Sequence, residues 1–378
     1  MKQARILIAA DLVPSETNFE KFEKGTMEDL LGEELAELWK GADYRIVNLE
    51  VPFIDGGKPI KKSGPNMSAP TRCFTGLRTL KVSCAAIANN HIMDFGADGL
   101  KNTIGLLDAA GIQHTGTGMD RREADKGIDV DINGIRLGIY ACSEHEFSAA
   151  GIHTPGANAI GVNTCLRIAE LKKSTDYVIV LFHGGKQHYP YPTPEQQFRC
   201  RSFADAGADL VVCQHSHCVG CEETYNDSTI VYGEGNFISD YQNDECWETG
   251  LLIELRLEQE NKIDSSIIYH PIHKNEHATS CASGETGHQI MDGFYARGKA
   301  LDRVEAMFIE ETQKESLAFL RCLAGWSRWL RGIDRILLKD ALIKRKYSAK
   351  SRLLPLGVML CETNWEVTES ALRRENGS

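Results

Sequence analysis

The sequence predicts an α/β fold built around a mainly parallel β-sheet. Through the first three quarters of the 378 residues, short apolar runs rich in Ile, Val, Leu and Ala alternate with longer amphipathic stretches. Hydrophobic residues make up 42% of the chain and charged residues 25%, which is the composition of an ordinary globular protein. Strands that alternate with helices form βαβ units, so most neighbouring strands are expected to run parallel.

The elements follow one another regularly as far as residue 213. Apolar runs predict buried strands at residues 5–10, 44–49, 85–88, 177–182 and 209–213. Amphipathic stretches predict helices at residues 27–39, 98–110, 165–173 and 194–206. Gly111 directly follows the second of these helices, at the position where glycine commonly ends a helix.

One segment departs from this order and predicts an antiparallel hairpin. Residues 128–132 alternate apolar and polar side chains, and residues 136–141 form a second strand-like run. Asn133-Gly134 stands between them, and this dipeptide favours the tight turn of a hairpin. Further strands are predicted at residues 228–233, 251–257 and 263–272.

The composition and the residue pattern of the sequence change near residue 275. Residues 273–287 are polar and rich in Gly and Ser, and long helices are predicted beyond them at 306–320 and 324–337. We therefore expect a main domain of residues 1–275 and a helical C-terminal extension of residues 276–378. The basic segment around Trp329 is expected to pack its apolar face on the main domain, and the alternative is a membrane surface or a protein partner.

The charge balance limits the possible partners. The chain has 42 Lys and Arg against 53 Asp and Glu, a formal net charge of −11 at pH 7. Phosphate contacts need a surplus of basic residues, so a general nucleic-acid-binding protein is excluded. A phosphate-containing substrate or an anionic polymer precursor is compatible with this charge, because bound metal ions supply positive charge locally.

The apolar segments and cysteines bear on localisation. The apolar run before Asp11 is too short for a signal peptide, and no stretch approaches the roughly 20 apolar residues that span a bilayer. We expect a cytoplasmic protein without a transmembrane segment. The 12 cysteines are mostly scattered singly, which favours buried free thiols. For Cys218-x-x-Cys221, a zinc half-site or a redox pair is the less favoured alternative.

Potential metal ligands directly follow the five main predicted strands. Because the carboxyl ends of parallel strands meet at one edge of a sheet, these side chains are expected to converge. Carboxylates, an amide and imidazoles together suit a site of two divalent ions, Mn, Fe or Zn. A lone Asp is more often a helix cap and a lone His a hydrogen-bonded core residue. Buried side by side without metal, however, these groups would be unsatisfied. They are Asp11, Glu50, Asn90, His183, His215 and His217.

Several ordered motifs extend this pattern over residues 6–240. They are Asn48-Leu49-Glu50, Asn89-Asn90-His91-x-x-Asp94-x-Gly96, Gly116-x-Gly118, His183-Gly184-Gly185, His215-x-His217 and Tyr232-x-x-Gly235-Asn236-Phe237. Through them the chain resembles the bacterial CapA family of capsule and poly-gamma-glutamate biosynthesis proteins, within the calcineurin-like metallophosphatase superfamily. The resemblance implies a metallophosphatase-like four-layer sandwich of two mixed β-sheets flanked by helices, followed by the helical extension.

The resemblance also implies how the ligands divide between two metal ions. Glu50 stands where these enzymes carry the carboxylate that bridges the ions. The remaining ligands are Asp11 and His217 for one ion, and Asn90, His183 and His215 for the other.

Further residues near the centre are assigned other roles. The resemblance implies that His91 is the general acid that protonates the leaving oxygen, and Asp94 is expected to orient its ring. Lys62 is expected to contact an anionic substrate, and the alternative for it is a solvated loop. Asn236 is expected to form hydrogen bonds next to the metal site. Residues 144–146, Glu-His-Glu, either reach the site or carry incidental loop charges.

These features together predict a function. The resemblance implies a metal-dependent phosphatase or phosphodiesterase involved in capsule, poly-gamma-glutamate or exopolysaccharide biosynthesis. The alternative is a non-catalytic component of a polymer-synthesis assembly that binds polymer or partner proteins. The enzyme is favoured because a scaffold has no need for His183, His215 and His217 together.

Overall fold

The computed structural model describes residues 1–239, 245–275, 278–348, 351–361, 363–364, 367–369 and 372. The chain forms two compact units, Met1–Val304 and Glu305–Ser378. Among the described residues, no helix has both the length and the apolar character needed to cross a membrane. Residue 240, where the family resemblance was expected to end, and residue 276, where the extension was expected to begin, lie outside the described ranges.

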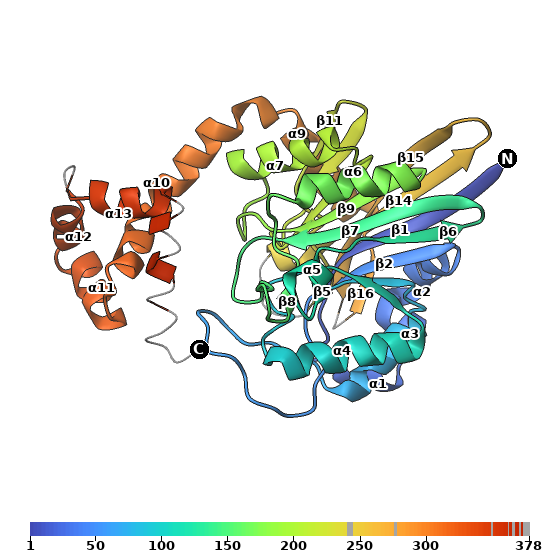
Figure 1. The fold of residues 1–378 in the computed structure, drawn as a ribbon, viewed down its shortest axis with the longest axis horizontal. Helices are drawn as coiled ribbons and strands as arrows, with labels where there is room; N and C mark the ends of the chain where they lie inside the picture. Colours follow the sequence, from blue (N-terminus) through green and yellow to red (C-terminus); the bar gives the residue numbers. More distant parts are fainter. Residues whose placement is uncertain are drawn as a thin grey trace. The chain divides into compact units, whose positions relative to one another are not determined.

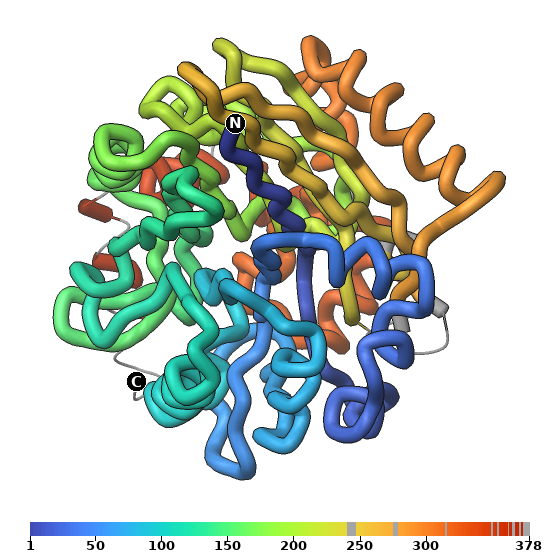
Figure 2. The backbone as a smooth tube through the Cα atoms, turned by 90° about the vertical axis from the view of Figure 1, so that its right-hand side faces the viewer, coloured from blue at the N-terminus to red at the C-terminus, as the bar shows by residue number. Residues whose placement is uncertain are grey.

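Eight strands form the larger sheet of the first unit, in the order β16-β15-β14-β1-β2-β3-β4 with β13 also paired to β1. Strands β1 to β4 run parallel, and β14 runs antiparallel to β1. Figure 2 shows the dark blue N-terminal strand alongside the orange strands. The bounds are β1 (Lys2–Leu12), β2 (Tyr44–Leu49), β3 (Cys84–Ala86), β4 (Gln113–Thr115), β13 (Asn236–Ile238), β14 (Thr249–Gln259), β15 (Ile263–Asn275) and β16 (Ala278–Cys281).

Six strands form the second sheet, in the order β11-β12-β10-β9-β7-β6. Its edge strands β11 and β6 are antiparallel to their neighbours, and the others run parallel. The predicted hairpin joins β6 to β7, and its turn residues Asn133 and Gly134 have φ of 55° and 86°. The bounds are β6 (Ile128–Ile132), β7 (Ile135–Ser143), β9 (Tyr177–His183), β10 (Leu210–Gln214), β11 (Glu222–Tyr225) and β12 (Ser228–Val231), while β5 (Thr117–Gly118) pairs with β8 (Gly156–Ala157).

The two sheets pack face to face, with helices on their outer sides (Figure 1). Side chains of β1 alternate between two cores, because Leu7 packs with the helices whereas Ile6 packs with the second sheet. On the far side, Phe203 of α7 packs edge-on against Phe182 of β9, with ring centroids 5.7 Å apart. The predicted four-layer sandwich of two mixed sheets is thereby confirmed.

Four helices of the first unit, α2, α4, α6 and α7, match the predicted amphipathic stretches, and the others were not predicted. The helices of this unit are α1 (Phe19–Lys24), α2 (Met27–Lys40), η1 (Thr71–Cys73), α3 (Phe74–Thr79), α4 (Gly96–Ala110), α5 (Arg121–Ala124), α6 (Thr164–Ser174), α7 (Pro194–Asp205), α8 (Glu245–Glu248), α9 (Gly284–Gly298) and η2 (Leu301–Arg303). Thr26 and Thr193 cap α2 and α7 with side-chain hydrogen bonds. Gly111 ends α4 in the left-handed conformation, with φ of 68°.

The second unit is helical in its described residues. Arg321 Nε lies 3.1 Å from Asp334 Oδ2, and this buried pair joins α10 to α11. The helices of the second unit are α10 (Val304–Leu323), α11 (Arg328–Ile336), α12 (Ala341–Lys346) and α13 (Leu353–Leu360). The first unit ends at Val304 and includes β16 and α9. A separately folding extension from residue 276, and the surface to which α11 binds, stay predictions.

Candidate metal centre

The carboxyl ends of strands from both sheets bring the six predicted ligands to one place. Asp11 lies at the end of β1, next to Asn48 of β2 and Asn236 of β13 in the strand register. Glu50 follows β2 directly, and Asn90 follows β3. The strands thus converge as expected for an α/β sheet. Five of the six ligands are buried, namely Asp11, Glu50, His183, His215 and His217.

One group of donor atoms surrounds the ring of His183. Its Nε2 lies 3.0 Å from Asn90 Oδ1, 3.0 Å from His215 Nδ1 and 3.5 Å from Glu50 Oε1. Donor atoms of Glu50, His183 and His215 lie within 4.8 Å of one another. This spacing suits ligands of a single metal ion.

A second group lies beside the first and shares Glu50 with it. Donor atoms of Asp11, Glu50 and His217 also lie within 4.8 Å of one another, and His217 Nδ1 is 3.2 Å from Asp11 Oδ2. A carboxylate that belongs to both groups is positioned to bridge two ions. The two groups have the composition that the resemblance implies.

The charge states of these residues fit divalent cations. Asp11 Oδ2 and Glu50 Oε1 are buried, yet neither accepts a hydrogen bond from the described part of the chain. Burial raises the pKa of Glu50, and the nearby Asp11 raises it further. Burial lowers the pKa of His183 well below its ordinary value and that of His215 to about 3, so both imidazoles are neutral and can ligate a metal.

His217 differs from the other two histidines. Burial alone would lower its pKa, but the close contact of its Nδ1 with Asp11 Oδ2 and the charges of Glu50 and Asp11 raise that pKa to about 9. Without metal its ring is therefore protonated at neutral pH. Ligation by His217 requires the loss of this proton.

The backbone of the last two histidine ligands is left-handed. His215 has φ of 88° and His217 has φ of 57°, values uncommon for residues other than glycine. Both rings nevertheless reach the centre. Strained residues of this kind cluster at functional sites.

His91, Asp94 and Lys62 form a chain of contacts next to Asn90. His91 Nδ1 lies 2.7 Å from Asp94 Oδ2. Lys62 Nζ pairs with the other oxygen of Asp94 and lies 3.2 Å from His91 Nδ1. The side chain of Lys62 is only 5% exposed, so the structure does not support a solvated loop at this residue.

Three residues outside the ligand groups hold these ligands in place. Asn236 Oδ1 lies 3.0 Å from His217 Nδ1, and Trp247 stacks on the His217 ring with centroids 3.9 Å apart. Asn48 Nδ2 donates a 2.6 Å hydrogen bond to Asp11 Oδ1 and lies 3.2 Å from His183 Nδ1. The sequence assigned no role to Asn48 or Trp247. The role of Asn48 could have been predicted, because it precedes the ligand Glu50 by two residues in the same motif. No motif of the sequence includes Trp247.

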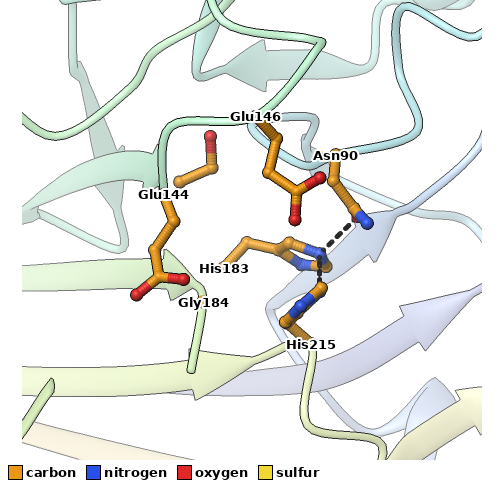
Figure 3. A pocket seen from close by; sticks show the side chains of 7 residues that line it. Asn90, Glu144, Glu146, His183, Gly184 and His215 are labelled. Atoms are coloured by element: carbon orange, nitrogen blue, oxygen red, sulfur yellow. Dashed lines mark hydrogen bonds between the residues drawn. The ribbon is translucent and has the colours of Figure 1, made fainter. Parts of the chain in front are cut away.

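A narrow pocket with closely packed walls lies beside the first group of ligands (Figure 3). It is lined by Asn90, Ser143, Glu144, Glu146, His183, Gly184 and His215. Glu144 and Glu146 therefore reach the site, which the sequence left open.

The cysteine pair lies apart from this chemistry. Cys218 and Cys221 are buried free thiols, and burial raises the pKa of Cys221 to about 12. Neither belongs to a three-ligand metal group among the described residues.

Comparison with known proteins gives a family match that contains all six ligands. Residues 6–241 match the model of a family described as "Bacterial capsule synthesis protein PGA_cap". Relatives include the capsule biosynthesis protein CapA of Bacillus anthracis, 28% identical over 212 residues, and the PGA biosynthesis protein CapA of Bacillus subtilis (strain 168), 31% identical over 210 residues. These alignments cover 53% and 54% of this chain but 51% and 55% of the relatives, so the chain spans about half their length.

Among solved structures, the 5'-nucleotidase from Candida albicans SC5314 matches 82% of this chain and 58% of its own, with 11% identity and a TM-score of 0.40. This likeness is too low to support an inference about function.

Proposed function

The chain belongs to the bacterial capsule synthesis protein family PGA_cap, and from this premise we propose that it is a metal-dependent phosphohydrolase with two divalent ions. The observation that supports the proposal most is the shared carboxylate of Glu50, which stands between two buried groups of donor atoms. The names of the relatives support a role in capsule or poly-gamma-glutamate biosynthesis.

The residues of the centre form two ligand sets, one for each ion. Glu50, Asn90, His183 and His215 would hold one, and Asp11, Glu50 and His217 the other. When bound, two such ions supply Lewis-acid stabilisation of the charge that develops on a phosphoryl group, with Mn, Fe or Zn compatible with these ligands.

His91 would supply the proton to the leaving oxygen. With Nδ1–H donated to Asp94 over 2.7 Å, the opposite nitrogen Nε2 is the one left to face a substrate. Asp94 holds the orientation of the ring, and Lys62 holds Asp94 through their ion pair. Lys62 thereby acts through Asp94 as well as offering a positive charge next to the site.

Metal analysis and hydrolysis assays test this function. Protein purified without added metal should contain Mn, Fe or Zn, and it should hydrolyse a phosphomonoester or a phosphodiester. His215→Ala should contain less metal than the parent and should lose the activity, because it removes a member of one ligand group. His114→Ala is the matched control, because His114 pairs with Asp108 away from the ligand groups.

Two results would count against the proposal. Absence of metal even after reconstitution would favour the alternative, a non-catalytic component that binds polymer or partner proteins. Equal hydrolysis by the parent and by His215→Ala would show that the activity does not arise at this centre.

A further inference from the structure

Two carboxylates wall the pocket beside the first group of metal ligands. Glu144 and Glu146 belong to the loop after β7, and the last residue of that strand, Ser143, pairs with His183 in the parallel register. The loop is therefore held directly against a predicted metal ligand. In Figure 3 the carboxylate of Glu146 lies near Asn90 and His183, whereas Glu144 lies near Gly184.

The position of Glu144 depends on a glycine. A Cβ atom built on Gly184 would lie 2.6 Å from Glu144 Cγ and 2.8 Å from Phe182 Cζ. Any larger residue at this position would displace Glu144. Arg199 Nη1 lies 3.9 Å from Glu144 Oε1, at the limit of an ion pair.

The side-chain carboxylate of Glu146 has no hydrogen bond or ion pair with any of the described residues, and only its backbone carbonyl accepts one, from Ala149 N–H. Burial raises the pKa of its carboxyl, and the more distant Lys62 and His91 act in the opposite direction. A cation that enters the pocket would meet this carboxylate without having to displace a partner.

A buried hydroxyl provides an independent sign of a ligand. Ser143 is 2% exposed and lines the pocket. Its Oγ has no hydrogen-bond partner within the described part of the chain. A buried hydroxyl without a partner carries a desolvation cost, which a ligand that donates a hydrogen bond would offset.

We propose that the pocket of Glu144, Glu146 and Ser143 binds the ammonium group of the substrate, so that the substrate is a phosphate ester of an amino alcohol or a similar amine. The inference rests on the proposed function, because it places the phosphoryl group at the metal ligands and the amine-bearing leaving group beside Glu146. Water and the ester give phosphate and the free amino alcohol. The P–O bond to the leaving group breaks and a new P–O bond to water forms. His91 gives its proton to the leaving oxygen, and the proton that the attacking water loses passes to solvent, from which His91 is protonated again.

Two nearly isosteric esters test this substrate class. Phosphoethanolamine and propyl phosphate differ mainly in an ammonium group in place of a methyl group. We expect kcat/KM to favour phosphoethanolamine by at least about tenfold, the size of one charge-assisted hydrogen bond. Glu146→Gln and Glu144→Gln should each lower this ratio. Gly184→Ala should lower it in the same way as Glu144→Gln, because its Cβ displaces Glu144.

The matched control is Glu195→Gln. Glu195 is an exposed carboxylate that pairs with the same Arg199 but does not line the pocket. Its substitution should leave the ratio between the two esters unchanged.

A binding measurement separates this inference from the proposed function. Isothermal titration should show tighter binding of 2-aminoethylphosphonate than of propylphosphonate, and Glu146→Gln should abolish the difference. A binding preference without hydrolysis of either ester would support the pocket and overturn the phosphohydrolase. Hydrolysis or binding without preference for the amine would overturn the pocket, including the case in which a further metal ion occupies it.

Discussion

At the scale of single residues, the centre combines ligands with the groups that hold them. Asp11 Oδ2 and Glu50 Oε1 are buried carboxylate oxygens that accept no hydrogen bond from the described residues. Asn48 fixes Asp11 and contacts His183, and Trp247 covers the ring of His217. Such outer partners orient the ligands and tune their basicity. The centre therefore extends well beyond the six side chains that would touch a metal.

Substitution of His91 tests its role as the general acid. His91→Gln should retain metal, because His91 belongs to neither ligand group, and should lower kcat by about 10²–10⁴-fold. The measurements are metal content and steady-state kinetics on one phosphate ester, with His114→Gln as the control. Parental activity in His91→Gln would remove His91 from the reaction.

Asn48 is expected to matter for metal affinity rather than for the fold. Asn48→Ala removes the contacts with Asp11 and His183, and should weaken metal binding by about 10–100-fold. Titration of Mn²⁺ or Zn²⁺ into metal-free protein measures this loss. Asn102→Ala is the control, because Asn102 donates to the backbone of Phe53 outside the centre. An unchanged affinity in Asn48→Ala would contradict the assigned role.

At the scale of elements, long patterned segments could be predicted from the sequence and short ones could not. The helix expected at 27–39 is α2, and the hairpin around Asn133-Gly134 is present. Strands such as β4 and β13 have only three residues, too few for a periodic pattern, and exist because neighbouring strands offer them hydrogen bonds. The helix α9 begins within the polar segment 273–287. Its start is polar because the helix buries only the side that carries Ile290 and Phe294.

A buried carboxylate ties three strands of the larger sheet together. Glu254 of β14 is fully buried and contacts Arg5 of β1 at 2.7 Å, Arg256 at 2.6 Å and His270 of β15 at 2.7 Å. Burial alone would raise the pKa of Glu254, but hydrogen bonds from these three residues lower it from 4.5 to about 2. The ionised carboxylate therefore stabilises the pairing of β1, β14 and β15.

The pH dependence of stability follows from this shift. Because the folded-state pKa of Glu254 is depressed, its contribution is fully present above about pH 4.5 and is lost as the pH falls through 2. Glu254→Gln should lower the free energy of unfolding at pH 7, and its stability should fall less steeply than that of the parent between pH 4.5 and 2. Denaturant unfolding at a series of pH values measures both slopes. Equal slopes of the free energy of unfolding against pH in the two proteins would contradict the depressed pKa of Glu254.

At the scale of the whole molecule, the candidate metal centre lies where the two sheets meet. Asp11 and Glu50 come from the larger sheet, whereas His183 and His215 follow strands of the second. An ion held by ligands from both sheets would cross-link the sandwich at one edge.

Metal removal should therefore lower the stability of the first unit. A ligand at 100 times its Kd stabilises the folded state by about 2.7 kcal/mol, so chelation should lower the melting temperature by several degrees. Calorimetry of metal-loaded and chelated protein measures this shift. His215→Ala should show a smaller shift on chelation than the parent, because one of the two ligand groups has lost a member. A parental shift in that variant would mean that the metal binds elsewhere.

The α/β class, the main strands and helices, and the residues that gather at the strand ends could be predicted from the sequence. This was possible because periodic burial and the position after a parallel strand are local properties of the chain. The folded structure was needed to show that Glu50 is shared by two groups, that Lys62 is buried against Asp94, and that Glu144 and Glu146 line a pocket. These facts depend on distances between segments from different strands, and such distances are set by how the two sheets pack.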